Sequence, residues 1–365
     1  VSNIISKDPS RVIAGNERVI RPRLADAVFF FETDKKTTLE SCNQALGKVV
    51  FQAELGTVLE KTQRVAQLAS RIATLIGADS TLAARAATLS KADLNTSMVL
   101  EFSDLQGLMG HVYALNDGED ATVAAALEQH YWPKFAGDRL PQSAIASSVA
   151  IADRLDTLVG LFGIGQPPTG SKDPYALRRA TVGLLRIIIE QGLELDLATL
   201  LQTSYNLHGD LSVPLAKVEP QLLNFVFDRL RAYYEDQKVA VDIYLAVMEN
   251  KSNSPLDFHR RVQAVSEFLK LESAPALAAS NKRVVNILSK NGNGNASFDA
   301  ALLEEVAEIT LADSLKKVKQ INLAVIAQGN YHDALQQLAQ LAGPLDHFFS
   351  DIMVMTDDEA LKNNR

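Results

Sequence analysis

Apolar residues recur along this chain at intervals of three, four and seven, and this spacing constrains the fold more than any other feature. Such spacing places apolar side chains on one face of an α-helix, where they can pack against a core. The pattern runs through residues 58–76, 177–189, 222–234, 258–271 and 302–326. Alternating patterns typical of strands are rare, so the sequence predicts a mainly α fold.

Residues with helix-capping side chains stand near the expected helix starts. Asp257 precedes Phe258, and Asn330 precedes the run YHDALQQLAQL. Ser273 precedes an alanine-rich run with Pro275 near its beginning, and proline suits the first turn of a helix. Each of these residues therefore marks an expected helix start.

Clusters of glycine, proline and asparagine interrupt the helical pattern at residues 132–141, 163–174, 208–220 and 291–297. Because such clusters cannot sustain a helix, we expect loops or domain joints there. Long amphipathic segments flank residues 209–220, which we expect to form an inter-domain boundary. A length of 365 residues agrees with two or three domains.

Composition narrows the classes of protein to which the chain can belong. Its net charge of −8 argues against non-specific coating of nucleic acid but leaves local basic patches open. No run of about 18 apolar residues occurs, so no membrane span is expected. The single cysteine, Cys42, cannot form an internal disulfide, and the N-terminus lacks a secretory-signal pattern, so we expect a cytoplasmic location. The chain lacks an initiator methionine, so we expect a piece of a longer protein.

Patterns that could carry catalysis are weak in this sequence. GQPPTGSKD, starting at Gly165, nearly matches a phosphate-binding loop, but Lys172 stands one place late and two prolines remove backbone donors. Acidic residues also occur at spacings that metal sites or acid–base couples use: Glu101 with Asp104, Asp153 with Asp156, and the doublet His332–Asp333. None has the histidine spacing of a metal site, so the sequence predicts no catalytic residue and no metal.

Basic residues are the remaining candidates for function. Asp173 is placed to cap a helix beginning at Pro174, which would present Arg178 and Arg179 together. Basic and aromatic residues also interleave in FVFDRLRAYY (225–234), FHRR (258–261) and NKR (281–283). Solvated arginines around a helical core are the ordinary explanation of these patterns, and contacts to RNA phosphates and unstacked bases require the same residue types.

Several long stretches, taken in order, resemble the β subunit of the two-subunit bacterial glycyl-tRNA synthetase. They are GNERVIRPRLADAVFFFETD (15–34), FQAELGT (51–57), LSKADLNTSMVLEFSDLQGLMG (89–110), IADRLDTLVGLFGIGQ (151–166) and SKDPYALRRA (171–180). The resemblance covers nearly the whole chain, and it is specific because several unusual motifs agree at once.

This resemblance implies a domain organisation. Residues 1–41 would be the end of a preceding domain with a connector, and residues 42–208 an HD-like helical domain with the linker helices that follow it. Residues 220–365 would form a helical anticodon-binding domain of the arginyl-tRNA synthetase type. We expect the chain to begin after the N-terminal domains of the β subunit and to stop inside, or just short of the end of, the anticodon-binding domain.

The metal-binding positions of an HD domain are altered in this chain. Lys61 stands where a metal-binding histidine would be, and the HD-doublet region has Lys91 and Asp93 but no histidine. Only Asp153 is kept as a possible ligand. Because a lysine cation repels a divalent ion and supplies no imidazole, the resemblance implies a retained scaffold that contacts tRNA. A metal-dependent HD-type phosphohydrolase is the alternative.

The resemblance also implies a function and partners. In this family the α subunit activates glycine with ATP and Mg²⁺, so this chain would be non-catalytic, without a cofactor of its own, and would position tRNA(Gly) in an α2β2 enzyme. The residues expected to contact tRNA are Lys172, Arg178 and Arg179 in the HD-like domain, with Arg229, Arg231, Lys282 and Arg283 in the anticodon-binding domain.

Overall fold

The computed structural model describes residues 7–250, 252–291 and 298–365. These residues fold almost entirely into helices, so the predicted mainly α fold is confirmed. They divide into two compact units: unit 1 holds the described residues up to Tyr233 with Asn253–Pro255, and unit 2 holds the others. No helix in the described part of the chain is both long enough and apolar enough to cross a lipid bilayer.

Unit 1 consists of helices and one short antiparallel hairpin, β1 (Val50–Gln52) with β2 (Gly56–Thr57). Its helices are α1 (Pro9–Asp34), α2 (Leu39–Ala45), α3 (Val58–Leu75), α4 (Ser80–Leu89), α5 (Ser97–Glu101), α6 (Leu108–Asn116), α7 (Ala121–Gln129), α8 (Ala144–Gly163), α9 (Leu177–Glu190), α10 (Leu197–Leu207) and most of α11 (Leu215–Asp236). Short 3₁₀ turns lie at Leu46–Lys48, Ala92–Asn95 and Ser103–Leu105.

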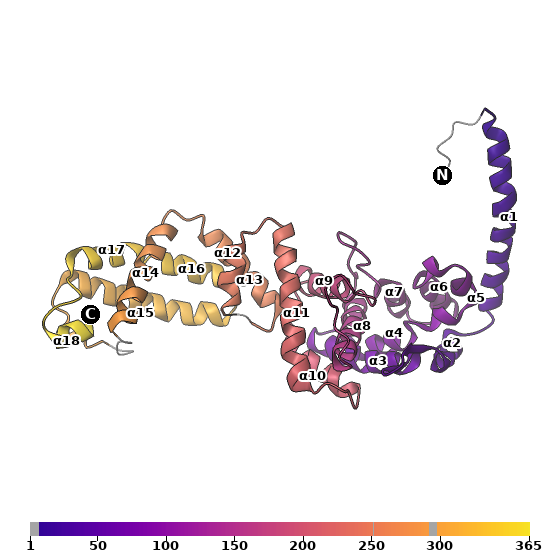
Figure 1. Ribbon diagram of the computed structural model, residues 1–365, viewed down its shortest axis with the longest axis horizontal. Coiled ribbons are helices and arrows are strands. Elements are labelled where there is room, and N and C mark those ends of the chain that lie inside the picture. Colours follow the sequence, from indigo (N-terminus) through magenta and orange to yellow (C-terminus); the bar gives the residue numbers. More distant parts are fainter. Residues whose placement is uncertain (1–6, 251, 292–297) are drawn as a thin grey trace. The chain divides into compact units, whose positions relative to one another are not determined.

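Helix α8 is the centre of unit 1. Most of its residues are buried, because α3, α4, α7, α9 and α10 pack around it (Figure 1). A helix that is apolar on nearly all sides belongs in a core. Its buried charged residues, Arg154 and Asp156, must therefore find their partners inside the fold.

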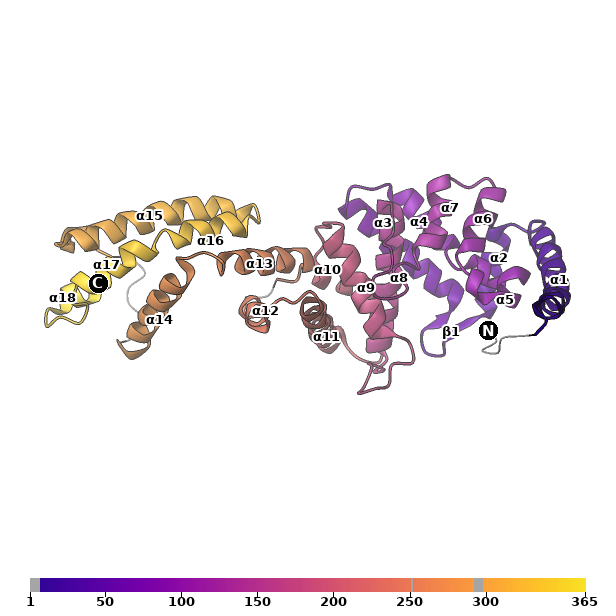
Figure 2. The same cartoon turned by 90° about the horizontal axis from the view of Figure 1, so that it is seen from above.

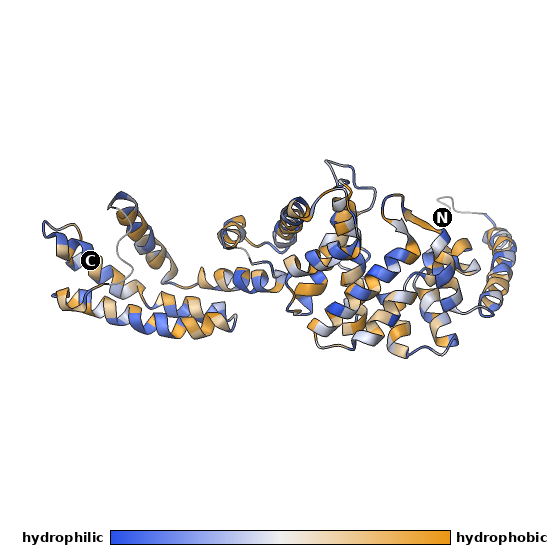
Figure 3. Ribbon diagram, turned by 90° about the horizontal axis from the view of Figure 1, so that it is seen from below, coloured by the Kyte–Doolittle hydropathy of each residue, from blue (hydrophilic) through white to orange (hydrophobic). Residues whose placement is uncertain are grey.

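Helix α1 contrasts with α8, because none of its residues is buried. Figure 3 shows hydrophobic and hydrophilic residues alternating along α1, and Val19, Val28 and Phe29 are exposed. Its last residue, Asp34, joins it to the rest of the unit by accepting hydrogen bonds from the backbone N–H groups of Ser97 (2.9 Å) and Met98 (2.8 Å). The end of α1 therefore caps the start of α5.

Unit 2 is also helical. Its helices are α12 (Val241–Met248), α13 (Pro255–Phe268), α14 (Ala274–Asn291), α15 (Val306–Ala327), α16 (Tyr331–Ala339), α17 (Ala342–Asp351) and α18 (Glu359–Asn364), with a 3₁₀ turn at Ala300–Leu302. Helices α15 and α16 lie side by side (Figure 2), and α17 packs against α14 and α15. Leu311, Phe348 and Ile352 form a small core there, while Tyr234 stacks with Phe258 at a centroid distance of 6.1 Å.

Two of the three helix starts expected from capping residues agree with the structure. Asn330 caps α16 by accepting from the backbone N–H of Asp333. Helix α3 begins at Val58, where the apolar pattern begins, and Thr57, which is not among the expected caps, caps it in a capping box with Glu60. Helix α14 begins directly after Ser273. The start expected at Phe258 is wrong, because α13 begins at Pro255 and Asp257 lies in its first turn, where a carboxylate is also favourable.

The break expected over residues 208–220 is shorter than the sequence predicts. Helix α11 begins at Leu215 and contains Pro220. Val218 and Leu222, on either side of the proline, are buried, and their burial offsets the hydrogen bond that proline cannot donate. The two units divide after Tyr233, inside α11. The break expected at 291–297 falls, apart from the backbone of Asn291, outside the described residues.

Candidate nucleic-acid interface

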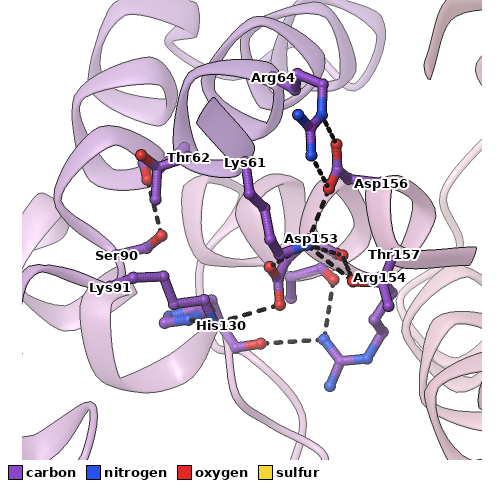
Figure 4. A network of polar contacts seen from close by, with 12 residues as sticks. Lys61, Thr62, Arg64, Ser90, Lys91, His130, Asp153, Arg154, Asp156 and Thr157 are labelled. Carbon is purple, nitrogen blue, oxygen red and sulfur yellow. Dashed lines mark hydrogen bonds and ion pairs between the residues drawn. The ribbon is translucent and has the colours of Figure 1, made fainter. Parts of the chain in front are cut away.

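A buried ionic cluster lies between α3, α7 and α8 in unit 1 (Figure 4). Helix α3 supplies Lys61, the turn after α4 supplies Lys91, and α8 supplies Asp153. The Nζ atom of Lys61 lies 3.1 Å from Asp153 Oδ1, and the Nζ atom of Lys91 lies 3.3 Å from Asp153 Oδ2. The structure thus brings together Lys61, Lys91 and Asp153, which are three of the four residues at the metal-binding positions implied by the HD resemblance.

The second partner of Lys61 is Asp156, one turn further along α8. The distance from Lys61 Nζ to Asp156 Oδ2 is 3.0 Å, and Arg64 Nε lies 2.7 Å from Asp156 Oδ1. Lys61 also donates to the hydroxyl of Thr157 at 2.8 Å and to the carbonyl of Asp153 at 3.2 Å. The ammonium group of Lys61 is therefore fully enclosed by acceptors.

The charges in this cluster fix its protonation state. Burial raises the pKa of Asp153, but the charges of Lys61 and Lys91 more than offset it, and the net shift is downward. Burial lowers the pKa of Lys61, but its two carboxylates outweigh that effect and raise it. For Lys91, which faces one carboxylate and the neighbouring charge of Lys61, burial prevails and the pKa falls. Asp153 is thus an ionised carboxylate held between two cationic positions.

His130 joins the cluster from the end of α7, and no pattern in the sequence indicates this. Its Nε2 atom lies 2.8 Å from Lys91 Nζ. Burial, and then the charge of Lys91, depress the pKa of His130 well below its ordinary value, so a neutral ring accepts the hydrogen bond from Lys91. This imidazole faces an ammonium group, and its other nitrogen faces the carbonyl of Ala126.

The cluster does not fit a divalent metal. Both oxygens of Asp153 face lysine ammonium groups, and two cations beside the carboxylate would repel a metal ion. Across residues 7–250, 252–291 and 298–365, no group of three or more His, Cys, Asp or Glu side chains is arranged to hold a metal. The arrangement is that of a buried ion-pair network that joins α3 and α8.

Asp93, the fourth HD-like position, does not join this cluster. Its Oδ2 atom accepts hydrogen bonds from the backbone N–H groups of Gly107 (2.6 Å) and Gly110 (3.2 Å), at the start of α6. Gly107 has a φ of +86°, and a β-carbon there would lie 2.7 Å from the ring of Tyr131. Asp93 therefore holds a tight turn in place and ties it to α6.

We expect Asp93→Ala to lower the free energy of unfolding by about 1–3 kcal/mol, because two buried backbone donors lose their acceptor. Chemical denaturation followed by circular dichroism measures this change. The exposed Asp26→Ala is the control, with an expected change within about 0.5 kcal/mol. Equal effects of the two substitutions would contradict this role of Asp93.

The other acidic patterns have structural partners. Glu101 forms an ion pair with Arg23 of α1. In the His332–Asp333 doublet, Asp333 contacts the side chain of Asn330, and His332 Nε2 lies 2.9 Å from the side-chain nitrogen of Gln336. The contacts of His332 and Asp333 are those of an ordinary helix start.

Arg178 and Arg179 lie at the start of α9. The helix begins at Leu177 rather than at Pro174, because Ala176 has a left-handed conformation with a φ of 53°. Asp173 still caps it, accepting from the backbone N–H groups of Leu177 (2.8 Å) and Arg178 (3.0 Å). The preceding near-match to a phosphate loop forms a tight turn closed by Thr169 and the exposed Lys172.

Three of the expected tRNA contacts meet at one place in unit 1. Arg178, Arg179 and Arg229 line the same pocket, of about 510 Å³, between α9, α11 and the loop after α7. The expected domain organisation places Arg229 in a different domain from Arg178, whereas the structure places both in unit 1. Arg231 is exposed on α11, beyond the residues that line the pocket.

The remaining expected contacts lie in unit 2. Lys282 and Arg283 are exposed on α14 and, with Lys290, line a shallow pocket of about 510 Å³. The guanidinium of Arg283 lies 4.4 Å from the ring centroid of Phe349. Positive charge is therefore concentrated on α14, although the whole chain has a net charge of −8.

Comparison with known families identifies both parts of the chain. Residues 1–249 match the family model of the glycyl-tRNA synthetase beta subunit, and residues 277–365 match that of the DALR anticodon binding domain.

Individual relatives agree with this result over the full length of the chain. It is 52% identical to the glycine–tRNA ligase beta subunit of Shewanella piezotolerans, 53% identical to that of Shewanella pealeana and 50% identical to that of Pseudoalteromonas atlantica. These alignments include all of this chain and 53% of each relative, so the chain spans about half of their length. The chain therefore belongs to the glycyl-tRNA synthetase β-subunit family.

Proposed function

We propose that this chain is a tRNA-binding, non-catalytic part of a glycine–tRNA ligase. In this proposal it positions tRNA(Gly) for ATP-dependent glycylation by a separate α subunit in the cytoplasm. The observation that carries the proposal is family membership combined with basic surfaces on each of the two units. Local positive charge on an acidic chain favours selective over general contact with nucleic acid.

The buried cluster supports the non-catalytic part of the proposal. Asp153, the one HD-type ligand position that is kept, is neutralised by Lys61 and Lys91. We infer that unit 1 retains an HD-like scaffold for its shape, and that ATP and Mg²⁺ act at the α subunit. Holding tRNA in place raises the rate at a partner's active site through orientation, without a reacting group on the positioning chain. An α2β2 assembly is the arrangement that we expect.

The proposal is tested by binding and by reconstitution. We expect tRNA(Gly) to bind the chain in a salt-dependent manner and more tightly than other tRNAs, as measured by filter binding. Glycylation by a purified α subunit should depend on addition of the β subunit. Equal affinity for all tRNAs, or glycylation by the α subunit alone at full rate, would count against the proposal.

Lys282 and Arg283 provide a test of the anticodon side. We expect Lys282→Ala with Arg283→Ala to weaken tRNA(Gly) binding by about tenfold and to reduce discrimination against a tRNA(Gly) with a substituted anticodon, because charged hydrogen bonds to the RNA are removed. The exposed pair Lys316 and Lys317 on α15, both changed to alanine, is the matched control. If both double variants weaken binding equally, the effect reflects net charge alone.

A further inference from the structure

The pocket that Arg178, Arg179 and Arg229 share has an unusual lining. Apolar surface from the loop after α7, from α9 and from α11 is combined with guanidinium groups. The residues that define its character are Phe135, Val182, Ala232, Arg178, Arg179 and Arg229. An apolar pocket bordered by several cations fits a ligand that is both flat and anionic.

The charges around this pocket are largely uncompensated. Arg178 donates to the carbonyl of Gly170 at 2.6 Å, which carries no charge. The side chain of Arg179 forms no hydrogen bond or ion pair with any residue that the structure describes. The Nε atom of Arg229 is buried and has no acceptor among those residues. Only Arg186, also in the lining, is paired with a carboxylate, 2.7 Å from Glu190. The guanidinium of Arg229 lies 5.6 Å from the ring centroid of Phe225, and its charge borders the pocket without a carboxylate partner among the described residues.

Phe135 supplies the aromatic surface of this pocket. The residue is 63% exposed, so its ring is accessible to a ligand. It lies in the pocket lining together with the arginines. Aromatic rings and guanidinium planes are the surfaces on which unpaired nucleic-acid bases stack.

A second pocket adjoins the first and extends the surface. It has a volume of about 580 Å³ and shares Pro133 and Arg179 with the first pocket. Its lining is more polar and includes Gln106 and Lys134, together with the carboxylates of Asp104 and Asp153. Arg179 thus borders both pockets, which is where a phosphate linking two nucleotides of one strand would lie.

We propose that the arginine-lined pocket takes an unpaired nucleotide of single-stranded RNA, with its base on Phe135 and its phosphates at Arg179 and Arg229. This inference rests on the proposed tRNA-binding function and assigns a base-holding position to unit 1. An acidic peptide without aromatic residues would satisfy the arginines but presents no flat apolar surface to Phe135. A strand also accounts for the adjoining pocket, which a free nucleotide would leave unused.

The test compares a short single-stranded RNA with an abasic strand of the same length and charge. We expect the wild-type chain to bind the base-containing strand about tenfold more tightly, which is the scale of stacking one base on an aromatic ring. Phe135→Ala should abolish this preference and weaken tRNA(Gly) binding, whereas Phe135→Trp should retain both. Phe29→Ala, which removes a ring that is 66% exposed on α1, is the matched control and should change neither.

The outcomes separate this inference from the function on which it rests. If the wild-type chain binds tRNA(Gly) and Phe135→Ala changes neither affinity nor base preference, the pocket assignment is wrong and tRNA binding stands. Equal binding of the two strands by the wild-type chain, or no binding of either at low salt, also overturns it. Competition by free AMP as strong as that by the strand would overturn it too, in favour of a mononucleotide site. Failure to bind any tRNA(Gly) would overturn both proposals.

Discussion

Lys61→Ala is expected to lower the free energy of unfolding by about 3–5 kcal/mol, the range seen when one partner of a buried ion pair is removed. Lys61 is only 4% exposed and contacts both Asp153 and Asp156. Without Lys61, Asp153 still forms an ion pair with Lys91, and Asp156 still forms one with Arg64. The two buried carboxylates nevertheless lose the cation that lies between them. The lost ion pairs join α3 to α8, which are central to unit 1.

Urea denaturation followed by circular dichroism measures this effect. Lys35→Ala is the matched control, because Lys35 forms an exposed ion pair with Glu32 at 3.5 Å and should contribute no more than about 1 kcal/mol. Lys61→Met keeps the aliphatic stem and removes only the charge, so it separates the effect of packing from that of ion pairing. A change of less than about 1 kcal/mol in Lys61→Ala would show that the cluster does not stabilise unit 1.

The second large effect is expected from Arg178→Ala combined with Arg179→Ala. We expect the affinity for tRNA(Gly) to fall by about tenfold or more, because each charged hydrogen bond to a phosphate contributes more than about 1 kcal/mol. The slope of log affinity against log salt concentration should decrease by about one for each phosphate that the variant no longer neutralises. Titrations at several salt concentrations measure both quantities in one experiment.

The matched control for this double variant is Arg18→Ala with Arg71→Ala, which removes the same charge from exposed positions on α1 and α3. Asp173 caps α9 through backbone N–H groups, which the substitutions at 178 and 179 leave in place, so helix content should be unchanged. An unaltered salt slope would show that these two arginines do not contact phosphates.

The helices can be predicted from the sequence, because their signals are local. Thr57 and Glu60 stand three residues apart, and each satisfies a backbone N–H group at the start of α3. The predictions are wrong where a longer-range effect prevails over a local one. Pro220 lies inside α11 because the apolar residues around it are buried against the unit. Ala176 adopts a left-handed conformation that no residue pattern indicates.

The altered HD-type positions are only partly predictable. The family resemblance points to Lys61, Lys91 and Asp153, and the spacing of Asp153 and Asp156 suggests a shared face. The sequence cannot show that Asp93 faces the amides of Gly107 and Gly110, since that depends on how the turn before α6 folds back. Nor does any motif link His130 to Lys91.

The sequence by itself determined the helical class, the family and most of the residues that carry charge. Only the tertiary structure decided which charges meet. Lys61 and Asp153 are 92 positions apart, and Arg229 reaches the pocket of Arg178 and Arg179 only because α11 lies beside α9. A helix forms from interactions within a few residues, whereas an ion pair or a pocket exists only once the packing of distant helices has fixed the distance between its atoms.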